Sequence, residues 1–384
     1  MDTVKFALNI KFDRKAQEFF SEKIKYKELI NSPVDKGSSR YVYTANNWRK
    51  ERKKRGIYTP KIWFQEDFLN PQNKKLFIEV SVPKFLYGHN IAIPRDSDLL
   101  PFVEKMQSFL ENDIGTRKIF SKEILDAEPS LVAFSKNIDF TEICSCEQVI
   151  DTLSKFDDRF RSSCYIIKPR DGGAELYYST KSSTFKVYSK LQELKSNAIT
   201  PKEKNVIKSL SNERYKKNKV LLCELIRVEL TLKRKSTIKS RLKLYNCNEV
   251  TIENIFKNEI WKELLKKEVK RIFVHPLQDF IFLSSSNSPL VEAILDKNIK
   301  RIDKRMLAKY AIEKIQSKGG VKGFKEYSFN NYKSRQTYYN HINEINKIAK
   351  QINFASLNNL TASKIHNYFL SEFALKPFGQ TKLL

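Results

Sequence analysis

The stretch LCELIRVELTLK, Leu222 to Lys233, decides the fold, because apolar and polar residues alternate along it with a period of two. One face carries only aliphatic side chains, those of Ile226, Val228, Leu230 and Leu232. The other face carries Arg227, Glu229, Thr231 and Lys233. The alternation predicts a β-strand that packs one face on a core and presents charged groups on the other.

Two further segments repeat this alternation and also carry an acid on the polar face. In LFIEVSV, Leu76 to Val82, Glu79 alternates with aliphatic residues, and in KNIDFTEI, Lys136 to Ile143, Asp139 lies opposite Ile138. Three such strands would turn Glu79, Asp139 and Glu229 toward one surface and form an all-oxygen site suited to Mg²⁺ or Mn²⁺. The alternative is that each carboxylate is an ordinary solvent-facing strand residue.

The segment AELYYSTKSSTFKVYSKLQELK, Ala174 to Lys195, predicts a β-hairpin around a Thr/Lys/Ser turn. On its second strand, Lys186, Tyr188 and Lys190 share one face. A tyrosine between two ammonium groups suits attack on a phosphodiester, because the cations favour the phenolate and hold the phosphate. The alternative is a cross-strand aromatic residue flanked by two lysines that cover apolar surface.

The pattern of strands and helices predicts an α+β protein in three parts. Residues 1–125 are rich in short strands and form the N-terminal part of an antiparallel sheet core. Residues 126–245 hold the hairpin and helices with capping boxes, Ser145 with Gln148 and Thr200 with Glu203. Residues 246–384 are mostly helical and are predicted to bind DNA.

In the C-terminal part, a helix is predicted to begin near Ser334. Its apolar stripe comprises Tyr338, Ile342, Ile345, Ile348, Ala349 and Ile352. A helix-turn-helix module and an ordinary helical bundle with a basic outer face both fit this pattern. Near the N-terminus, the basic stretch from Arg49 to Arg55 is interpreted as a loop, either simply solvated or in contact with phosphates.

The charge of the chain indicates a polyanionic partner. With 71 Lys and Arg against 44 Asp and Glu, the formal net charge is +27, which favours nucleic acid over the alternatives of basic drift and a membrane surface. No apolar run is long enough to cross a bilayer, so a cytoplasmic protein is expected. The sequence lacks the H-x-H metal pair that common strand-nicking relaxases use. It also lacks a phosphate-binding G-x-x-x-x-G-K-[ST] loop, which argues against a helicase or another P-loop ATPase.

Taken in order, several of these segments resemble the replication initiators of filamentous phages and, more distantly, plasmid rolling-circle initiators. The resemblance covers about residues 5 to 352. It is carried by FIEVSVPKFLYGHNI (77–91), NIDFT (137–141), ELYYSTKSSTFKVYSKLQELK (175–195), LIRVELTLK (225–233) and SRQTYYNHINEI (334–345).

The resemblance implies a strand-nicking enzyme in which Tyr188 is the nucleophile and Asp139 and Glu229 hold Mg²⁺ or Mn²⁺. Further candidates are Glu79 and Glu193 as metal ligands, Lys186 and Lys190 as phosphate contacts, and Arg227 as a clamp for phosphate oxygens.

The expected activity is the start of rolling-circle replication in the cytoplasm of a bacterial host. A duplex origin is nicked to leave a 5′-phosphotyrosyl link and a free 3′-OH, and the displaced single strand is later religated. Host helicase and polymerase are the expected protein partners. Two rivals are a non-catalytic, sequence-specific DNA-binding protein and a structural RNA-binding protein.

Overall fold

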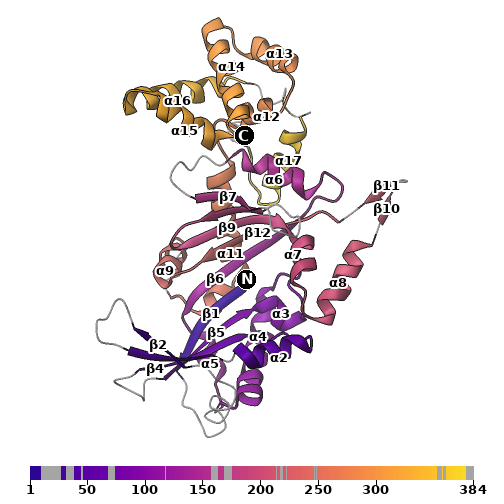
Figure 1. Ribbon diagram of the computed structural model, residues 1–384, viewed down its shortest axis with the longest axis vertical. Helices are drawn as coiled ribbons and strands as arrows, with labels where there is room; N and C mark the ends of the chain where they lie inside the picture. The colour runs from indigo at the N-terminus through magenta and orange to yellow at the C-terminus, as the bar shows by residue number, and fades with distance from the viewer. Residues whose placement is uncertain are drawn as a thin grey trace.

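The computed structural model describes residues 1–9, 27–31, 39–44, 46–67, 74–116, 118–156, 163–167, 175–212, 214–216, 219–221, 223–245, 247, 249–352, 357 and 360–377. An antiparallel sheet with helices on both faces forms most of the molecule, and a helical region extends beyond its β7 end (Figure 1). The predicted α+β class is confirmed.

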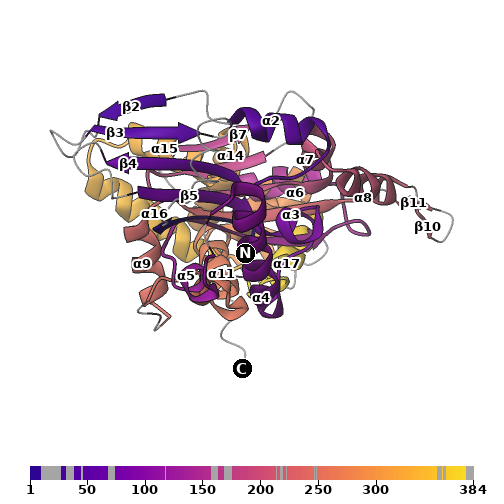
Figure 2. The same ribbon diagram turned by 90° about the horizontal axis from the view of Figure 1, so that it is seen from below.

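The described strands form a ten-stranded sheet in the order β2-β3-β4-β5-β1-β6-β12-β9-β8-β7. Their bounds are β1 Thr3–Asn9, β2 Lys27–Asn31, β3 Ser39–Thr44, β4 Lys61–Asp67, β5 Lys74–Ser81, β6 Pro129–Asp139, β7 Ser163–Ile167, β8 Glu175–Ser179, β9 Ser183–Ser189 and β12 Leu225–Leu232. A separate hairpin, β10 Arg214–Lys216 with β11 Lys219–Leu221, projects from the body of the molecule (Figures 1 and 2).

The central strands bury the aliphatic faces predicted for them. Ile226, Val228, Leu230 and Leu232 of β12, and Leu76, Ile78 and Val80 of β5, are buried. Strand β1 lies between β5 and β6, and β12 lies between β6 and β9. The sheet is therefore continuous across residue 125, and the polar faces of its strands form one surface.

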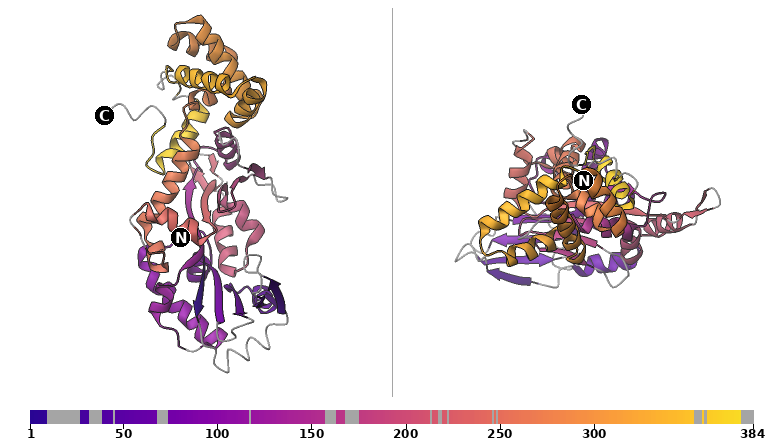
Figure 3. Two further views of the ribbon diagram at one scale, coloured as in Figure 1. Left: turned by 90° about the vertical axis from the view of Figure 1, so that its left-hand side faces the viewer. Right: turned by 90° about the horizontal axis from the view of Figure 1, so that it is seen from above.

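Helices cover both faces of the sheet. Helix α7 contacts β9 and β12, whereas α9 and α11 contact β6, and the left panel of Figure 3 shows α8 and α11 on opposite sides. The bounds are α2 Asn46–Lys54, α3 Val82–Tyr87, α4 Leu99–Ser108, α5 Ser121–Leu125, α6 Cys146–Ser154, α7 Lys190–Asn197, α8 Pro201–Ser211, α9 Lys235–Lys243, α10 Ile252–Phe256, α11 Asn258–Phe273 and α17 Thr361–Ser371. A 3₁₀ turn at Asp96–Asp98 precedes α4, and a π-helical segment at Phe109–Ile114 follows it.

Both predicted capping boxes are present. The Ser145 side chain accepts from the Gln148 N–H at the start of α6, and the Thr200 side chain accepts from the Glu203 N–H at the start of α8. Each box closes because the residue three positions on reaches back to the cap N–H.

Five helices follow α11 and extend beyond the β7 end of the sheet (Figure 1): α12 Gln278–Ser284, α13 Ser288–Asn298, α14 Ile302–Ser317, α15 Val321–Asn331 and α16 Arg335–Ala349. The apolar stripe predicted for α16 is buried throughout. Helix α17 returns to pack on α6, and Tyr368 meets Phe140 at the end of β6 edge to face. Among the described helices, none has the length and apolar character needed to span a membrane.

Candidate active site

A cleft of about 570 Å³ opens on the polar face of the sheet. Helices α2, α3 and α7 border it, and β1, β5, β8, β9 and β12 supply its floor. Five of the residues singled out from the sequence line this cleft: Tyr188, Glu229, Lys186, Glu79 and Glu193. The sheet thus brings together side chains that are as far apart in the sequence as residues 79 and 229.

The closest pairing among them joins Tyr188 and Glu229. The Tyr188 hydroxyl donates to Oε2 of Glu229 at 3.2 Å, although the two residues are not directly opposite. Tyr188 of β9 faces Arg227, and Glu229 faces Lys186, so the contact is a diagonal one across neighbouring strands. A hydroxyl that donates to a carboxylate is the arrangement of a nucleophile with its base.

Burial and like charge govern the protonation of this pair. Burial raises the pKa of Tyr188 well above its ordinary value, and the neighbouring Glu229 carboxylate raises it further. Burial also raises the pKa of Glu229, and the negative charge of Asp2 adds to the effect. Burial and the hydrogen-bonded Glu229 carboxylate thus outweigh the cations near Tyr188, contrary to the prediction that flanking cations favour its phenolate.

Lys190 does not share the face of Tyr188 and Lys186, contrary to the sequence prediction. Strand β9 ends at Ser189 and Lys190 begins α7, which turns its side chain under the helix, where it is fully buried. Its ammonium pairs with Glu193 at 2.6 Å, and burial lowers its pKa to about 8. Lys190 is therefore not available as a phosphate contact. Lys186 does line the cleft, where it pairs with Glu175 at 3.2 Å.

Arg227 is also buried, which corrects its predicted role as a phosphate clamp. Its Nε donates to Oδ1 of Asn137 at 2.8 Å, and its other nitrogens bond to Asp2 and the carbonyl of Asn90. The guanidinium has no exposed edge. Instead of binding substrate, it joins β12 and β6 to the segments that carry Asp2 and Asn90.

Asp139 does not reach the cleft, contrary to the predicted metal site. Asp139 of β6 pairs with Leu225 of β12, whereas Glu229 of β12 pairs with Ser135 of β6. The offset of four residues between Ser135 and Asp139 corresponds to about 13 Å along the strand. The exposed Asp139 carboxylate accepts from the backbone N–H of Thr141 at 2.9 Å, which forms a local turn. The alternation predicted correctly that Asp139 lies on the same face of the sheet as Glu229. The register of the strands, however, separates the two side chains along the strand.

The other two candidate metal ligands line the cleft but already have partners. Glu79 of β5 lies three strand spacings from β12, about 14 Å, and is 4.0 Å from Lys61. Glu193 is held by Lys190. Among the described residues, no three acidic, histidine or cysteine side chains form a group that could hold a metal ion.

Arg49, from the basic stretch noted in the sequence, and Asp2 also line the cleft, although neither was predicted as a site residue. Arg49 reaches it from α2, where its Nε donates to the carbonyl of Thr59 at 3.2 Å. The basic stretch that contains Arg49 is therefore mainly helix, not the predicted loop, since Lys, Arg and Glu are good helix formers. Asp2 lies just before β1, and no motif marks it in the sequence.

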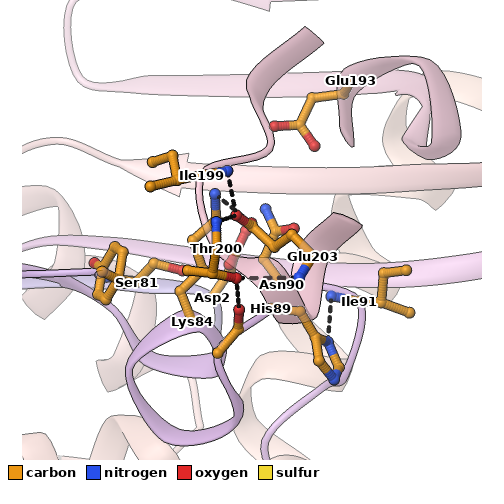
Figure 4. A network of polar contacts seen from close by, with 12 residues as sticks. Asp2, Ser81, Lys84, His89, Asn90, Ile91, Glu193, Ile199, Thr200 and Glu203 are labelled. Carbon is orange, nitrogen blue, oxygen red and sulfur yellow. Dashed lines mark hydrogen bonds and ion pairs between the residues drawn. The ribbon is translucent and has the colours of Figure 1, made fainter. Parts of the chain in front are cut away.

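A buried ion pair holds the segment between α7 and α8 beside the cleft (Figure 4). Glu203 is fully buried, accepts from the backbone N–H groups of Ile199 and Thr200, and lies 2.8 Å from the Lys84 ammonium. The Thr200 hydroxyl donates to the carbonyl of Gly88 at 2.6 Å. These bonds tie the start of α8 to α3, and Lys84 and Ile199 both line the cleft.

The cleft is more acidic than the rest of the chain. Five carboxylates line it (Asp2, Glu79, Glu175, Glu193 and Glu229), against three cationic side chains (Arg49, Lys84 and Lys186). Two of these carboxylates are paired with buried cations that do not line the cleft, Asp2 with Arg227 and Glu193 with Lys190, so much of the acidic charge is balanced.

The sequence model of one protein family, described as the N-terminal part of a phage replication-associated protein, matches residues 8–253. The chain belongs to this family. The matched residues include β5, β9 and β12, which carry four of the five predicted residues of the cleft and both partners of the Tyr188–Glu229 contact. No curated protein and no solved structure matches.

Family membership establishes the general function. The chain is a filamentous-phage-type rolling-circle replication initiator, and the predicted resemblance is confirmed. A replication initiator binds DNA, in agreement with the net charge. Proteins of this kind are generally nicking endonucleases.

Proposed function

We propose that this initiator nicks one strand of a duplex origin by attack of Tyr188 on a backbone phosphate. The observation that carries the proposal is the 3.2 Å hydrogen bond from the Tyr188 hydroxyl to Glu229 in the floor of the cleft. A buried hydroxyl with a raised pKa needs a partner to accept its proton as it attacks, and Glu229 is in position to do so.

The proposed step forms one bond and breaks another. The Tyr188 oxygen bonds to phosphorus while its proton passes to Glu229, and the bond from phosphorus to the 3′ oxygen breaks. The 3′ oxygen leaves as a hydroxyl after taking a proton from solvent, and the 5′ phosphate remains on Tyr188. Because the phosphotyrosyl ester retains the energy of the broken bond, attack by a 3′-OH can religate the displaced strand without ATP.

Arg49 and Lys186 are the proposed phosphate contacts. Both line the cleft, Arg49 from α2 and Lys186 from β9. They take the place of Lys190 and Arg227, which are buried. The planar guanidinium of Arg49 can bind two phosphate oxygens at once. The Lys186 ammonium, which pairs with Glu175 in the free protein, would exchange that partner for a phosphate oxygen.

A Mg²⁺ or Mn²⁺ ion would be held by two carboxylates of the cleft, fewer than the sequence predicted. Asp2 and Glu229, whose negative charges act on each other, would hold it, since Mg²⁺ commonly uses one or two carboxylates together with substrate phosphates and water. When bound, the ion would offset charge on the phosphoryl oxygens. Asp139, Glu79 and Glu193 are not part of this proposed pair.

The wider cycle follows from this chemistry. The free 3′-OH is a primer for a host polymerase, and a host helicase separates the strands, because the chain has no P-loop motif of its own. These partners place the protein in the cytoplasm of a bacterial host. The covalent link keeps it attached to the displaced single strand until closure.

The test compares the wild-type protein with Tyr188→Phe on a supercoiled plasmid that carries the origin, in the presence of Mg²⁺. The wild-type protein is expected to give open circles and a covalent protein–DNA adduct, and Tyr188→Phe is expected to give neither while binding the origin normally. Tyr177→Phe is the matched control, since Tyr177 is a tyrosine of the neighbouring strand β8 on the same face. An adduct that persists in Tyr188→Phe and maps to Tyr177 would refute the assignment, and binding without open circles from the wild-type protein would favour a non-catalytic origin binder.

A further inference from the structure

Helices α14, α15 and α16 form a three-helix unit outside the residues that the family model matches. The three helices contact one another, and their facing sides bury apolar side chains, among them Ala311, Ile315, Phe324, Ile342 and Ile345. Three residues, 332–334, join α15 to α16, and the Ser334 side chain caps α16 by accepting from the Thr337 N–H. Two packed helices joined by so short a turn have the connectivity of a helix-turn-helix.

The outer face of α16 carries polar side chains that the fold does not use. Gln336, Tyr339, Asn340 and Asn343 are all exposed and lie outside the buried stripe of the helix. None of the four is acidic. The acid of this helix, Glu344, is turned toward Lys304 of α14, 3.9 Å away.

These side chains are the ones that read base pairs in the major groove. Arginine makes paired hydrogen bonds to guanine, and glutamine and asparagine do so to adenine. Nε2 of Gln336 lies 2.9 Å from Oδ1 of Asn340, so the two amides already form a connected row along the helix. A helix is about 10–12 Å wide with its side chains, which matches a groove about 12 Å wide.

The position of the three-helix unit relative to the cleft is set by a close backbone contact. The N–H of Val321, at the start of α15, donates to the carbonyl of Lys155, at the end of α6. Gly320 has a φ of 115°, and a Cβ at this residue would lie 2.7 Å from Cα of Lys155. The close approach leaves room only for glycine at residue 320. The hydrogen bond from Val321 to Lys155 then holds α15 against the end of α6, which packs on β8 and β9.

We propose that α16 is the helix that reads the origin, with Gln336 and Asn340 in contact with base edges of duplex DNA. This inference rests on the proposed function, in which one sequence is selected and then nicked. The contact at Gly320 then sets the separation between the bound sequence and the phosphate that meets Tyr188. Sequence selection and cleavage thus lie on different parts of the chain.

The experiment selects binding sites for the full-length protein from a random-sequence duplex library at fixed salt. The wild-type protein is expected to enrich one site. Gln336→Ala and Asn340→Ala are expected to bind that site roughly ten- to a hundredfold more weakly and to lose preference at one or two positions each. Gln336→Arg is expected to change a preferred adenine to guanine. Gln316→Ala, which removes an exposed amide from α14, is the control and is expected to keep the wild-type site.

Adduct formation on a pool of single-stranded oligonucleotides measures the chemistry separately. The α16 variants are expected to form the adduct at the wild-type rate, because their substitutions are outside the cleft. If both alanine variants keep the wild-type affinity and preference, the proposal fails. If the variants lose the same affinity for every DNA sequence, the proposed contacts with base edges are also refuted, because α16 would then contact only phosphates. If no protein forms an adduct but the variants still change site preference, the proposed nicking fails while this inference stands.

Discussion

Replacing Glu229 by glutamine tests whether this residue takes the proton of Tyr188. Glutamine has nearly the same size and keeps an oxygen near the hydroxyl, but it cannot act as a base. A general base contributes about 10²- to 10⁴-fold to a rate. Adduct formation by Glu229→Gln at neutral pH should therefore fall by roughly that factor, while origin binding is unchanged.

The structure also predicts how this loss depends on pH. A phenolate and a carboxylate 3.2 Å apart repel each other by about 5 kcal/mol at an effective dielectric constant of about 20. Glutamine removes this repulsion, so the pKa of Tyr188 should fall in the variant, and hydroxide can then remove the proton directly. The rate of Glu229→Gln should rise about tenfold per pH unit in alkaline solution. In the wild-type protein, the rate should instead fall in acid with a midpoint above the ordinary glutamate value of 4.5.

The assay is single-turnover adduct formation on a single-stranded oligonucleotide, from acid to alkaline pH, with saturating Mg²⁺. Glu79→Gln is the matched control, because Glu79 lines the same cleft but its carboxylate pairs with Lys61 and not with Tyr188. A Glu229→Gln protein with the wild-type rate would refute the role of Glu229 as the base. So would a loss of the same size at every pH, because it would leave Glu229 with only its proposed share in metal binding or with a structural role.

Three further outcomes follow from the structure. Glu203→Gln removes the buried charge that pairs with the partly exposed Lys84 ammonium and should lower the free energy of unfolding by about 1.5–3 kcal/mol in urea titrations; full stability of this variant would show that the ion pair does not hold the α7–α8 segment. Burial raises the pKa of Asp279 in α12 from 3.8 to about 7, so the unfolded chain binds fewer protons in that interval and stability should fall as pH rises through it. Asp279→Asn should reduce this fall in the free energy of unfolding by up to about 4 kcal/mol. Parallel curves of stability against pH for the wild-type protein and the variant would contradict the prediction. Chelation of divalent ions should stop adduct formation but not origin binding, and added Mg²⁺ should restore it; undiminished adduct formation in the chelator would exclude the ion proposed at Asp2 and Glu229.

Local patterns predicted the elements of this protein well. The alternation in β12 and β5 identified which side chains are buried, and the two capping boxes marked the first residues of α6 and α8. These features depend on neighbours within a few positions, where side-chain direction and backbone hydrogen bonds are decided. The polar face that carries Tyr188 and Glu229 was predicted on the same basis.

The site predictions were wrong where the alternating pattern was continued past the end of a strand, or where a residue on the polar face was assumed to be exposed. Lys190 was assigned to the face of Tyr188, but β9 ends one residue earlier and α7 begins. Arg227 is on the polar face as predicted, yet the segments that carry Asp2 and Asn90 cover it. Asp139 has the right direction and the wrong position along its strand.

The sequence by itself determined the α+β class, the basic character of the chain, the polar strand faces and the start of α16, because each depends on composition or on spacing within one element. Only the tertiary structure decided which of those polar groups are neighbours. The pairing of β9, β12 and β6 sets the register that joins Tyr188 to Glu229 and separates Asp139 from them. Strand register and helix packing are set by contacts between distant residues, and no pattern within a single strand contains them.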